Sequence, residues 1–234
     1  MLEITFILCN SAREENIGAA ARALKTMGIS CLRLVAPSCD HLGQKAKAIA
    51  HGSHDVLEAA KVFPSLESAV EDISFVVGSA AKQRTVSQHY YPVQDIAKIL
   101  IDKKEIVKKV AVVFGGEESG LSNKQLSLCD ILTTIPMIKK YPSLNLGQAV
   151  MVYATYLSEI TLKREKEKTE NPAKDEISIV KEKAQQLLDD VEIDKDGIIY
   201  PRIMERLMSM NKDDINLFHS FCKYYLKKYH GRIK

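Results

Sequence analysis

Along the first 160 residues, apolar and polar stretches alternate in a way that predicts an α/β domain built on a mostly parallel sheet. Short runs rich in β-branched and apolar residues are typical of buried strands. We expect strands over 3–9, 31–36, 73–79, 110–115 and 131–136. Helical spacing of apolar residues predicts helices over 16–27, 44–60, 65–72, 92–102, 123–128 and 146–162. Strands joined through helices by short loops form βαβ units, whose strands run parallel.

The composition changes after this domain. The stretch 163–176 (KREKEKTENPAKDE) holds five basic and five acidic residues and no large apolar side chain. We interpret it as the frayed end of a helix that runs into a charged linker. Three further segments with helical spacing predict a small C-terminal helical domain: 177–191, 201–210 and 213–229. The expected organisation is a domain over 1–162, a linker over 163–176 and a helical domain over 177–234.

The composition excludes several classes of protein. No apolar run approaches the roughly 20 residues of a membrane span, and the N-terminus lacks the cationic start of a signal peptide, so we expect a cytoplasmic protein without a membrane partner. The five cysteines are scattered, with no Cys-x-x-Cys or Cys/His cluster, which indicates neither a disulfide framework nor a metal site.

The net charge of +3 is too small to indicate a nucleic-acid partner by itself. The distribution of charge is more informative, because residues 215–234 contain no acidic residue. The tail sequence KYYLKKYHGRIK interleaves tyrosines with cations, a pattern that suits base stacking on RNA. Tyr224 and Tyr225 could equally belong to a core.

The stretch 135–150 (IPMIKKYPSLNLGQAV) joins the last predicted strand to the long helix 146–162. Lys139 and Lys140 place two positive charges in the middle of this loop. Ser143 and Asn145 stand at the loop-to-helix junction, where small polar side chains cap a helix and can face a ligand.

Two earlier segments also carry candidate chemistry. The loop 115–120 (GGEESG) lacks the Gly-Lys-Ser/Thr of a phosphate loop and the glycine spacing of a dinucleotide-binding loop. Its two carboxylates suit a cationic ligand, and its glycines allow a ligand close to the main chain; the alternative is an ordinary strand-to-helix turn. In the segment 16–28 (NIGAAARALKTMG), Gly18 lies one helical turn before Arg22 and would leave room for a ligand beside the guanidinium.

In their order and separation, the segments 16–28, 112–123 and 135–150 resemble the three signature motifs of the SPOUT superfamily of RNA methyltransferases, in its SpoU/TrmH branch. The details are most similar to the TrmJ group, which 2′-O-methylates cytidine or uridine 32, the first nucleotide of the tRNA anticodon loop. The resemblance covers residues 4–162. It implies S-adenosylmethionine as cofactor, a tRNA anticodon stem-loop as RNA partner, a homodimer, a C-terminal trefoil knot in this domain and no metal.

The resemblance also implies roles for individual residues. The family pattern G-x-E-x-x-G-L corresponds to Gly115, Glu117, Gly120 and Leu121. The residues expected to bind the cofactor are Ser79, Ala80, Ala81, Gly115, Glu117, Ile135, Pro142, Ser143 and Leu144. Those expected to contribute to catalysis are Arg22, Asn16, Ser143 and Asn145. Those expected to contact RNA are Lys82, Arg84, Lys139 and Lys140.

Arg22 is the main catalytic candidate. A guanidinium stays protonated in proteins, so we expect it to bind a phosphate and stabilise a developing alkoxide rather than to act as a base. Three alternatives stay open: an rRNA 2′-O-methyltransferase of the same family, a non-catalytic RNA-binding protein on the same scaffold, and an α/β nucleotide-binding enzyme of unrelated chemistry. The missing phosphate loop disfavours the last of these.

Overall fold

The computed structural model describes residues 2–81, 89–138, 144–162 and 176–230. Its described strands form one parallel sheet in the order β3-β2-β1-β6-β4-β7-β5. Their bounds are β1 (Glu3–Cys9), β2 (Cys31–Val35), β3 (Lys61–Phe63), β4 (Phe75–Ser79), β5 (Tyr90–Pro92), β6 (Lys109–Phe114) and β7 (Ile131–Thr134). The predicted parallel sheet is confirmed, with β3 and β5 as additional short edge strands.

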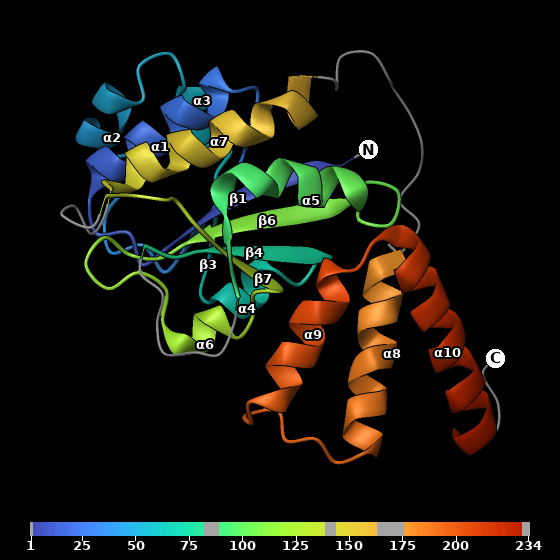
Figure 1. Cartoon of the computed structure of the whole chain (residues 1–234). Helices are drawn as coiled ribbons and strands as arrows, with labels where there is room; N and C mark the ends of the chain where they lie inside the picture. Colours follow the sequence, from blue (N-terminus) through green and yellow to red (C-terminus); the bar gives the residue numbers. More distant parts are fainter. Residues whose placement is uncertain (1, 82–88, 139–143, 163–175, 231–234) are drawn as a thin grey trace.

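Helices cover both faces of this sheet (Figure 1). On one face lie α1 (Glu14–Thr26), α2 (Gln44–Ile49), α3 (His54–Glu58), α5 (Ile96–Asp102, preceded by the 3₁₀ turn η1, Val93–Asp95) and α7 (Leu146–Leu162). On the other lie α4 (Leu66–Ala69) and α6 (Asn123–Leu126). The predicted helix 44–60 is two helices, because Gly52 between them has a φ of +76°, outside the helical region.

Alternate side chains of the interior strand β1 point to the two faces of the sheet. Phe6 and Leu8 belong to the core beneath α1 and α7, whereas Ile7 and Cys9 belong to the core beneath α4 and α6. This alternation follows from the two-residue period of a strand. It explains why β1 is apolar at nearly every position, as predicted for a strand buried on both sides.

Strands β6, β4 and β7 are neighbours in the sheet and run in the same direction. Their carboxyl ends, at Phe114, Ser79 and Thr134, therefore lie at the same edge of the sheet. This common edge is the position where open α/β sheets bind ligands.

Three helices follow the α/β layers: α8 (Glu176–Asp190), α9 (Ile199–Ser209) and α10 (Lys212–His230). They pack against the end of the sheet that carries α5 and β7 (Figure 1). Lys181 on α8 forms an ion pair with the buried Asp130 at 2.5 Å, and Glu205 on α9 accepts a hydrogen bond from the backbone N–H of His89. No helix within the described ranges is long and apolar enough to cross a membrane.

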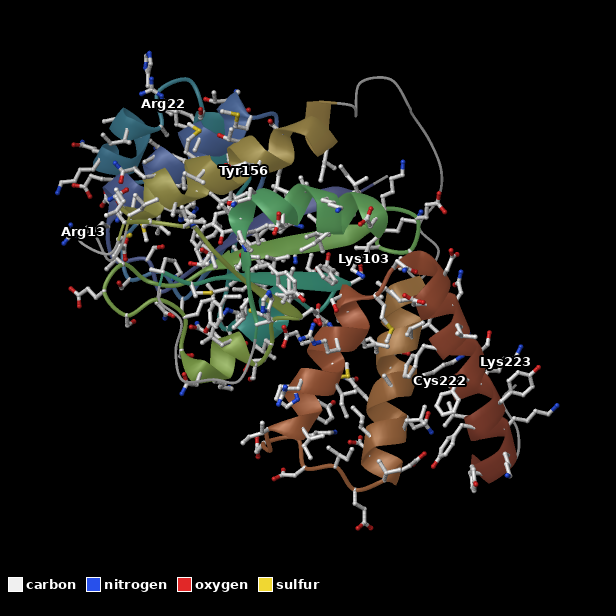
Figure 2. All side chains as sticks on the ribbon, viewed as in Figure 1. Arg13, Arg22, Lys103, Tyr156, Cys222 and Lys223 are labelled. Atoms are coloured by element: carbon white, nitrogen blue, oxygen red, sulfur yellow. The ribbon has the colours of Figure 1, made fainter. Side chains whose placement is uncertain are left out.

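Lys103, just after α5, is enclosed between the sheet and these three helices (Figure 2). Its side chain is 1% exposed, and its ammonium donates a hydrogen bond to the backbone carbonyl of Met210 after α9. Burial lowers the pKa of Lys103 to about 8, although the carboxylates of Asp102 and Asp130 oppose this shift.

Replacing Lys103 by Met should change how stability depends on pH. Between about pH 8 and the ordinary lysine pKa of 10.5, the unfolded chain keeps a proton that the folded chain gives up. The contribution of Lys103 to the free energy of unfolding therefore rises with pH across this window. We expect the wild type to gain stability relative to Lys103→Met as the pH rises from 8 to 10.5, measured by chemical denaturation. Lys104→Met, at the exposed neighbouring position, is the matched control. Parallel pH profiles for the wild type and Lys103→Met would contradict the burial argument.

Candidate functional site

A chain of hydrogen bonds joins the three motif segments at the edge of the sheet. The side-chain amide of Asn16, in the first turn of α1, donates to Glu117 Oε1 at 2.8 Å. The amide of Asn145, just before α7, donates to Asn16 Oδ1 at 2.8 Å. Asn16 is only 5% exposed, so both of its polar atoms are used inside the protein. This Asn16–Glu117–Asn145 network places a side chain from each motif at one site.

Glu117 is the charged end of the network. Its second carboxylate oxygen accepts a hydrogen bond from the backbone N–H of Ala12 at 3.2 Å. Partial burial raises the pKa of Glu117, but hydrogen bonds from Asn16 and from the backbone N–H groups around Ala12 outweigh burial and hold that pKa below its ordinary value. Glu117 is therefore ionised at neutral pH, and its negative charge lies at the N-terminus of α1, where the helix dipole stabilises it.

Asn145 also caps α7, as the sequence predicted. Its Oδ1 accepts the backbone N–H of Gly147 at 2.9 Å, and its own N–H donates to Gln148 Oε1 at 3.2 Å. Gly147 is needed where α7 crosses α1, because a Cβ atom there would lie 2.6 Å from the Cβ of Ala19. The orientation of Asn145 is thus fixed by its own helix as well as by Asn16.

The loop that carries Glu117 closes on itself. A Cβ at Gly115 would lie 1.9 Å from the carbonyl carbon of Gly120, and Gly116 and Gly120 form an antiparallel bridge. A Cβ at Gly116 would lie 3.0 Å from the carbonyl oxygen of Asn10. The space in the Cβ directions of both glycines is therefore filled by the protein itself. The expectation that a ligand approaches the main chain is therefore wrong for the Cβ side of Gly115 and of Gly116. On that side the absence of a Cβ allows the loop to pack closely against Gly120 and Asn10.

The edge beside this loop is lined by small and half-buried residues. Ser79 and Ala80 are half-buried where β4 ends, and the N–H of Ala80 donates to the carbonyl of Thr133 at 2.9 Å. Ile135 is half-buried, and Leu144 is 37% exposed. Small and half-buried side chains at adjoining strand ends fit a flat, partly apolar ligand such as a nucleoside.

A buried tyrosine ties α7 to the same edge. The Tyr153 hydroxyl lies 2.8 Å from Thr133 Oγ1, which donates to the carbonyl of Gly78. Burial raises the pKa of Tyr153, with hydrogen bonds to Ser79 and Thr133 opposing the shift. Tyr153 shares one face of α7 with the fully buried Val150 and Leu157. Its helical position alone gave no signal that its hydroxyl would fix the ends of β4 and β7.

A polar cleft of about 590 Å³ opens next to the network. It is lined by Ala12, Arg13, Glu14, Glu15, Asn16, Cys39, Lys45 and Asn145. The Lys45 ammonium pairs with Glu15 at 3.2 Å. Both asparagines of the network line this cleft, Asn145 as an exposed side chain and Asn16 as a largely buried one. Sequence analysis assigned no role to the other lining side chains.

Arg22 is not part of this assembly. Its side chain is exposed on α1 and points outward, away from the sheet and from the cleft rim where Arg13 lies (Figure 2). Among the described residues its guanidinium has no ion-pair partner. The room expected beside Gly18 does not exist, because a Cβ there would lie 2.3 Å from the carbonyl oxygen of Ala46. Gly18 instead allows α2 to pack on α1.

Several predicted residues lie outside the described ranges, and their role stays a prediction: Lys82, Arg84, Lys139, Lys140, Pro142 and Ser143. Ala81 is exposed at the end of its described segment. No group of three or more His, Cys, Asp or Glu residues in the described part of the chain could hold a metal ion.

Comparison with known proteins gives two family matches. The model described as "SpoU rRNA Methylase family" matches residues 3–155, and the model described as "tRNA/rRNA methyltransferase LasT, C-terminal domain" matches residues 175–229. The first match contains all three motif segments. The second begins next to the predicted boundary of the C-terminal helices.

Individual relatives agree with these matches. The Escherichia coli (strain K12) protein described as "Uncharacterized tRNA/rRNA methyltransferase LasT" is 40% identical over 219 residues, which cover 93% of this chain and 95% of that protein. The "tRNA (cytidine/uridine/adenosine-2′-O-)-methyltransferase TrmJ" of Pseudomonas aeruginosa (strain UCBPP-PA14) is 39% identical over 149 residues, 64% of this chain and 58% of that protein. The crystal structure of TrmJ from Z. mobilis ZM4 superimposes with a TM-score of 0.64 at 27% identity, over 94% of this chain and 98% of that one.

The network predicts a pH-dependent effect of Asn16→Asp. This change replaces the donor 2.8 Å from Glu117 with a second carboxylate, so two negative charges would face each other. We expect the variant to lose roughly 1–3 kcal/mol of unfolding free energy at pH 7. This loss should shrink as the pH falls, for two reasons. In the variant, protonation of one carboxylate removes the repulsion. In the wild type, the low pKa of Glu117 stabilises the folded state only while the carboxylate is ionised, so that contribution is lost at acidic pH.

Chemical denaturation at neutral and acidic pH tests this prediction. Asn216→Asp, at an exposed position on α10, adds the same charge away from the network and should leave stability nearly unchanged. Equal stability of Asn16→Asp and Asn216→Asp at pH 7 would show that the Asn16–Glu117 bond contributes nothing.

Proposed function

Because this chain belongs to the SpoU rRNA methylase family, we propose that it is an S-adenosylmethionine-dependent RNA methyltransferase that acts on the ribose 2′-hydroxyl of a tRNA. The observation that carries the proposal is the network of Asn16, Glu117 and Asn145, which joins the three motif segments beside an open polar cleft. Within tRNA, the resemblance to the TrmJ group favours cytidine or uridine 32 in the anticodon stem-loop.

The described part of the strand-end edge fits the cofactor. When bound, S-adenosylmethionine supplies an electrophilic methyl group on a sulfonium. We assign its binding to Ser79, Ala80, Ala81, Gly115, Glu117, Ile135 and Leu144, together with Pro142 and Ser143 outside the described ranges. Half-buried Ile135 and exposed Leu144 offer apolar contact to an adenine ring. Glu117 would contribute to this binding without direct contact: its two oxygens accept hydrogen bonds from Ala12 and Asn16, and its negative charge attracts the sulfonium through space.

The acceptor ribose would enter from the polar cleft. Asn16 and Asn145 are fixed by their hydrogen bonds and can orient the hydroxyl without losing side-chain freedom on binding. Arg22 would bind the adjacent phosphate and stabilise the alkoxide as the proton leaves. Lys82, Arg84, Lys139 and Lys140 would neutralise RNA phosphates around the site.

The outward direction of Arg22 supports a homodimer. An exposed guanidinium on α1 that points away from its own cleft can serve the cleft of a second subunit. We therefore propose that each site combines the strand-end loops of one subunit with Arg22 of the other.

Family resemblance carries three further proposals: the trefoil knot in the α/β part, domains over 1–162 and 177–234 with a linker between them, and a cytoplasmic location. The family matches at 3–155 and 175–229 support the domain division.

An rRNA substrate is a second candidate, because the matching family is described by rRNA methylation. Methylation mapping of bulk RNA from a deletion strain distinguishes the two. Loss of a single ribose methylation in tRNA supports the proposal, and loss in rRNA with tRNA unchanged moves the substrate to the ribosome.

Cofactor binding makes the first prediction for this function. S-adenosylmethionine and S-adenosylhomocysteine should each raise the Tm, whereas ATP and NAD should not. At a ligand concentration about 100 times Kd, mass action stabilises the folded state by about 2.7 kcal/mol, which corresponds to a Tm shift of several degrees. Absence of any shift with both sulfur nucleosides would overturn the proposed chemistry.

Arg22→Lys makes the second prediction. Lysine keeps the charge but loses the planar, two-pronged donor, and removing one such transition-state donor lowers turnover by roughly 10²–10³-fold. The Tm shift with S-adenosylmethionine should stay as in the wild type, since Arg22 acts on the acceptor. Methyl transfer to unmodified tRNA is the measurement. Lys25→Ala, three residues along the same helix, is the control and should keep its activity. Near-normal turnover of Arg22→Lys would remove the role assigned to the guanidinium.

A further inference from the structure

Helix α10 has a face that is left uncovered by the residues the structure describes. Its opposite face is buried through Ile215, Cys222 and Leu226, which are at most 4% exposed. The outward side chains Leu217, Phe221 and Tyr224 are 72%, 55% and 76% exposed. They follow one another at intervals of four and three residues, so they form one stripe along the helix. Contiguous exposed apolar side chains of this kind mark an interaction surface.

The stripe borders a groove of about 580 Å³ that continues onto Met210 and Phe218. Apart from Ser220 and the carboxylate of Asp214, the lining is apolar or aromatic, and it contains no lysine or arginine. An RNA backbone lying in this groove would meet a negative charge and no cation. The groove itself therefore favours a protein occupant, although lysines lie elsewhere on the same helix.

The charges along α10 indicate which protein partner fits this groove. Asp213 and Asp214 lie in its first turn, and Lys227 and Lys228 lie near its end. A second α10 that runs antiparallel would place its basic end beside the acidic end of the first, on both sides of a two-fold axis. A parallel partner would instead bring like charges together. The four-and-three spacing of the stripe is also the spacing of a coiled-coil seam.

We propose that this surface binds a second copy of the same chain, with the two α10 helices packed antiparallel through the stripe of Leu217, Phe221 and Tyr224. A single helix face buries less than the ~1,200 Å² of a stable standard interface. The contact is therefore weak by itself. It strengthens the association of subunits that another interface also holds together, or it links two such assemblies. It is independent of methyl transfer and of the Arg22 site.

Cysteine cross-linking of the full-length protein tests the contact. Phe221→Cys places a thiol in the middle of the stripe, where two antiparallel copies approach each other. Asn216→Cys, exposed on the same helix but away from the stripe, is the control. After nuclease treatment and mild oxidation, we expect severalfold more disulfide-linked pairs from Phe221→Cys than from Asn216→Cys or the wild type. Equal yields would overturn the proposal.

Charge reversal tests the antiparallel orientation. In the Phe221→Cys background, Asp214→Lys and Lys228→Glu should each lower the cross-linking yield, and the two together should restore it. Unchanged yields in both single variants would overturn the antiparallel arrangement. A third outcome would assign the surface to RNA and so contradict the proposal. In it, Phe221→Cys would cross-link no more than the wild type, and added tRNA would protect its thiol from reaction with maleimide.

Discussion

The hydrogen bond from Asn16 to Glu117 is the contact on which the candidate site depends. It connects the first turn of α1 with the loop after β6, and Asn145 extends it to the start of α7. Each member needs the others. Glu117 keeps its charge because Asn16 and the backbone N–H groups at the start of α1 donate to it. Asn16 can remain buried because both ends of its amide are occupied. Hydrogen bonds that satisfy the buried amide of Asn16 in this way give the linked side chains one orientation, which is what a site that must align a hydroxyl requires.

The surrounding packing holds these three elements at the right separation. Glycines do this where backbones come closest: Gly18 allows α2 against α1, Gly147 allows α7 against α1, and Gly115 allows its loop to close on Gly120. Tyr153 adds a buried hydroxyl that fixes α7 to the ends of β4 and β7. The polar network is thus held in place by a frame of close contacts between neighbouring segments.

Local sequence patterns predicted the elements well where the pattern was long. The helix 146–162 has the predicted bounds, and the five predicted strands are all present. The edge strands β3 and β5 were missed because three residues are too few to show a period. The identity of the network could not be predicted, since Asn16 and Glu117 are 101 residues apart and no local pattern records their pairing. The direction of Arg22 was missed for a related reason. Helical spacing groups Gly18 with Arg22, but only the packed structure reveals that α2 occupies the space beside Gly18.

The separation between the members of the network has a consequence for the order of events during synthesis. Asn145 lies 129 residues after the asparagine it contacts, and Glu117 lies 101 residues after it. On the ribosome, β1, α1 and β2 emerge long before either partner exists, so Asn16 must stay hydrated until the strand β6 has entered the sheet. The catalytic geometry can then be completed only when α7 docks on α1. A nascent chain that stalls before this helix would hold all seven described strands together with Asn16 and Glu117, but it would lack the helix that orients Asn145.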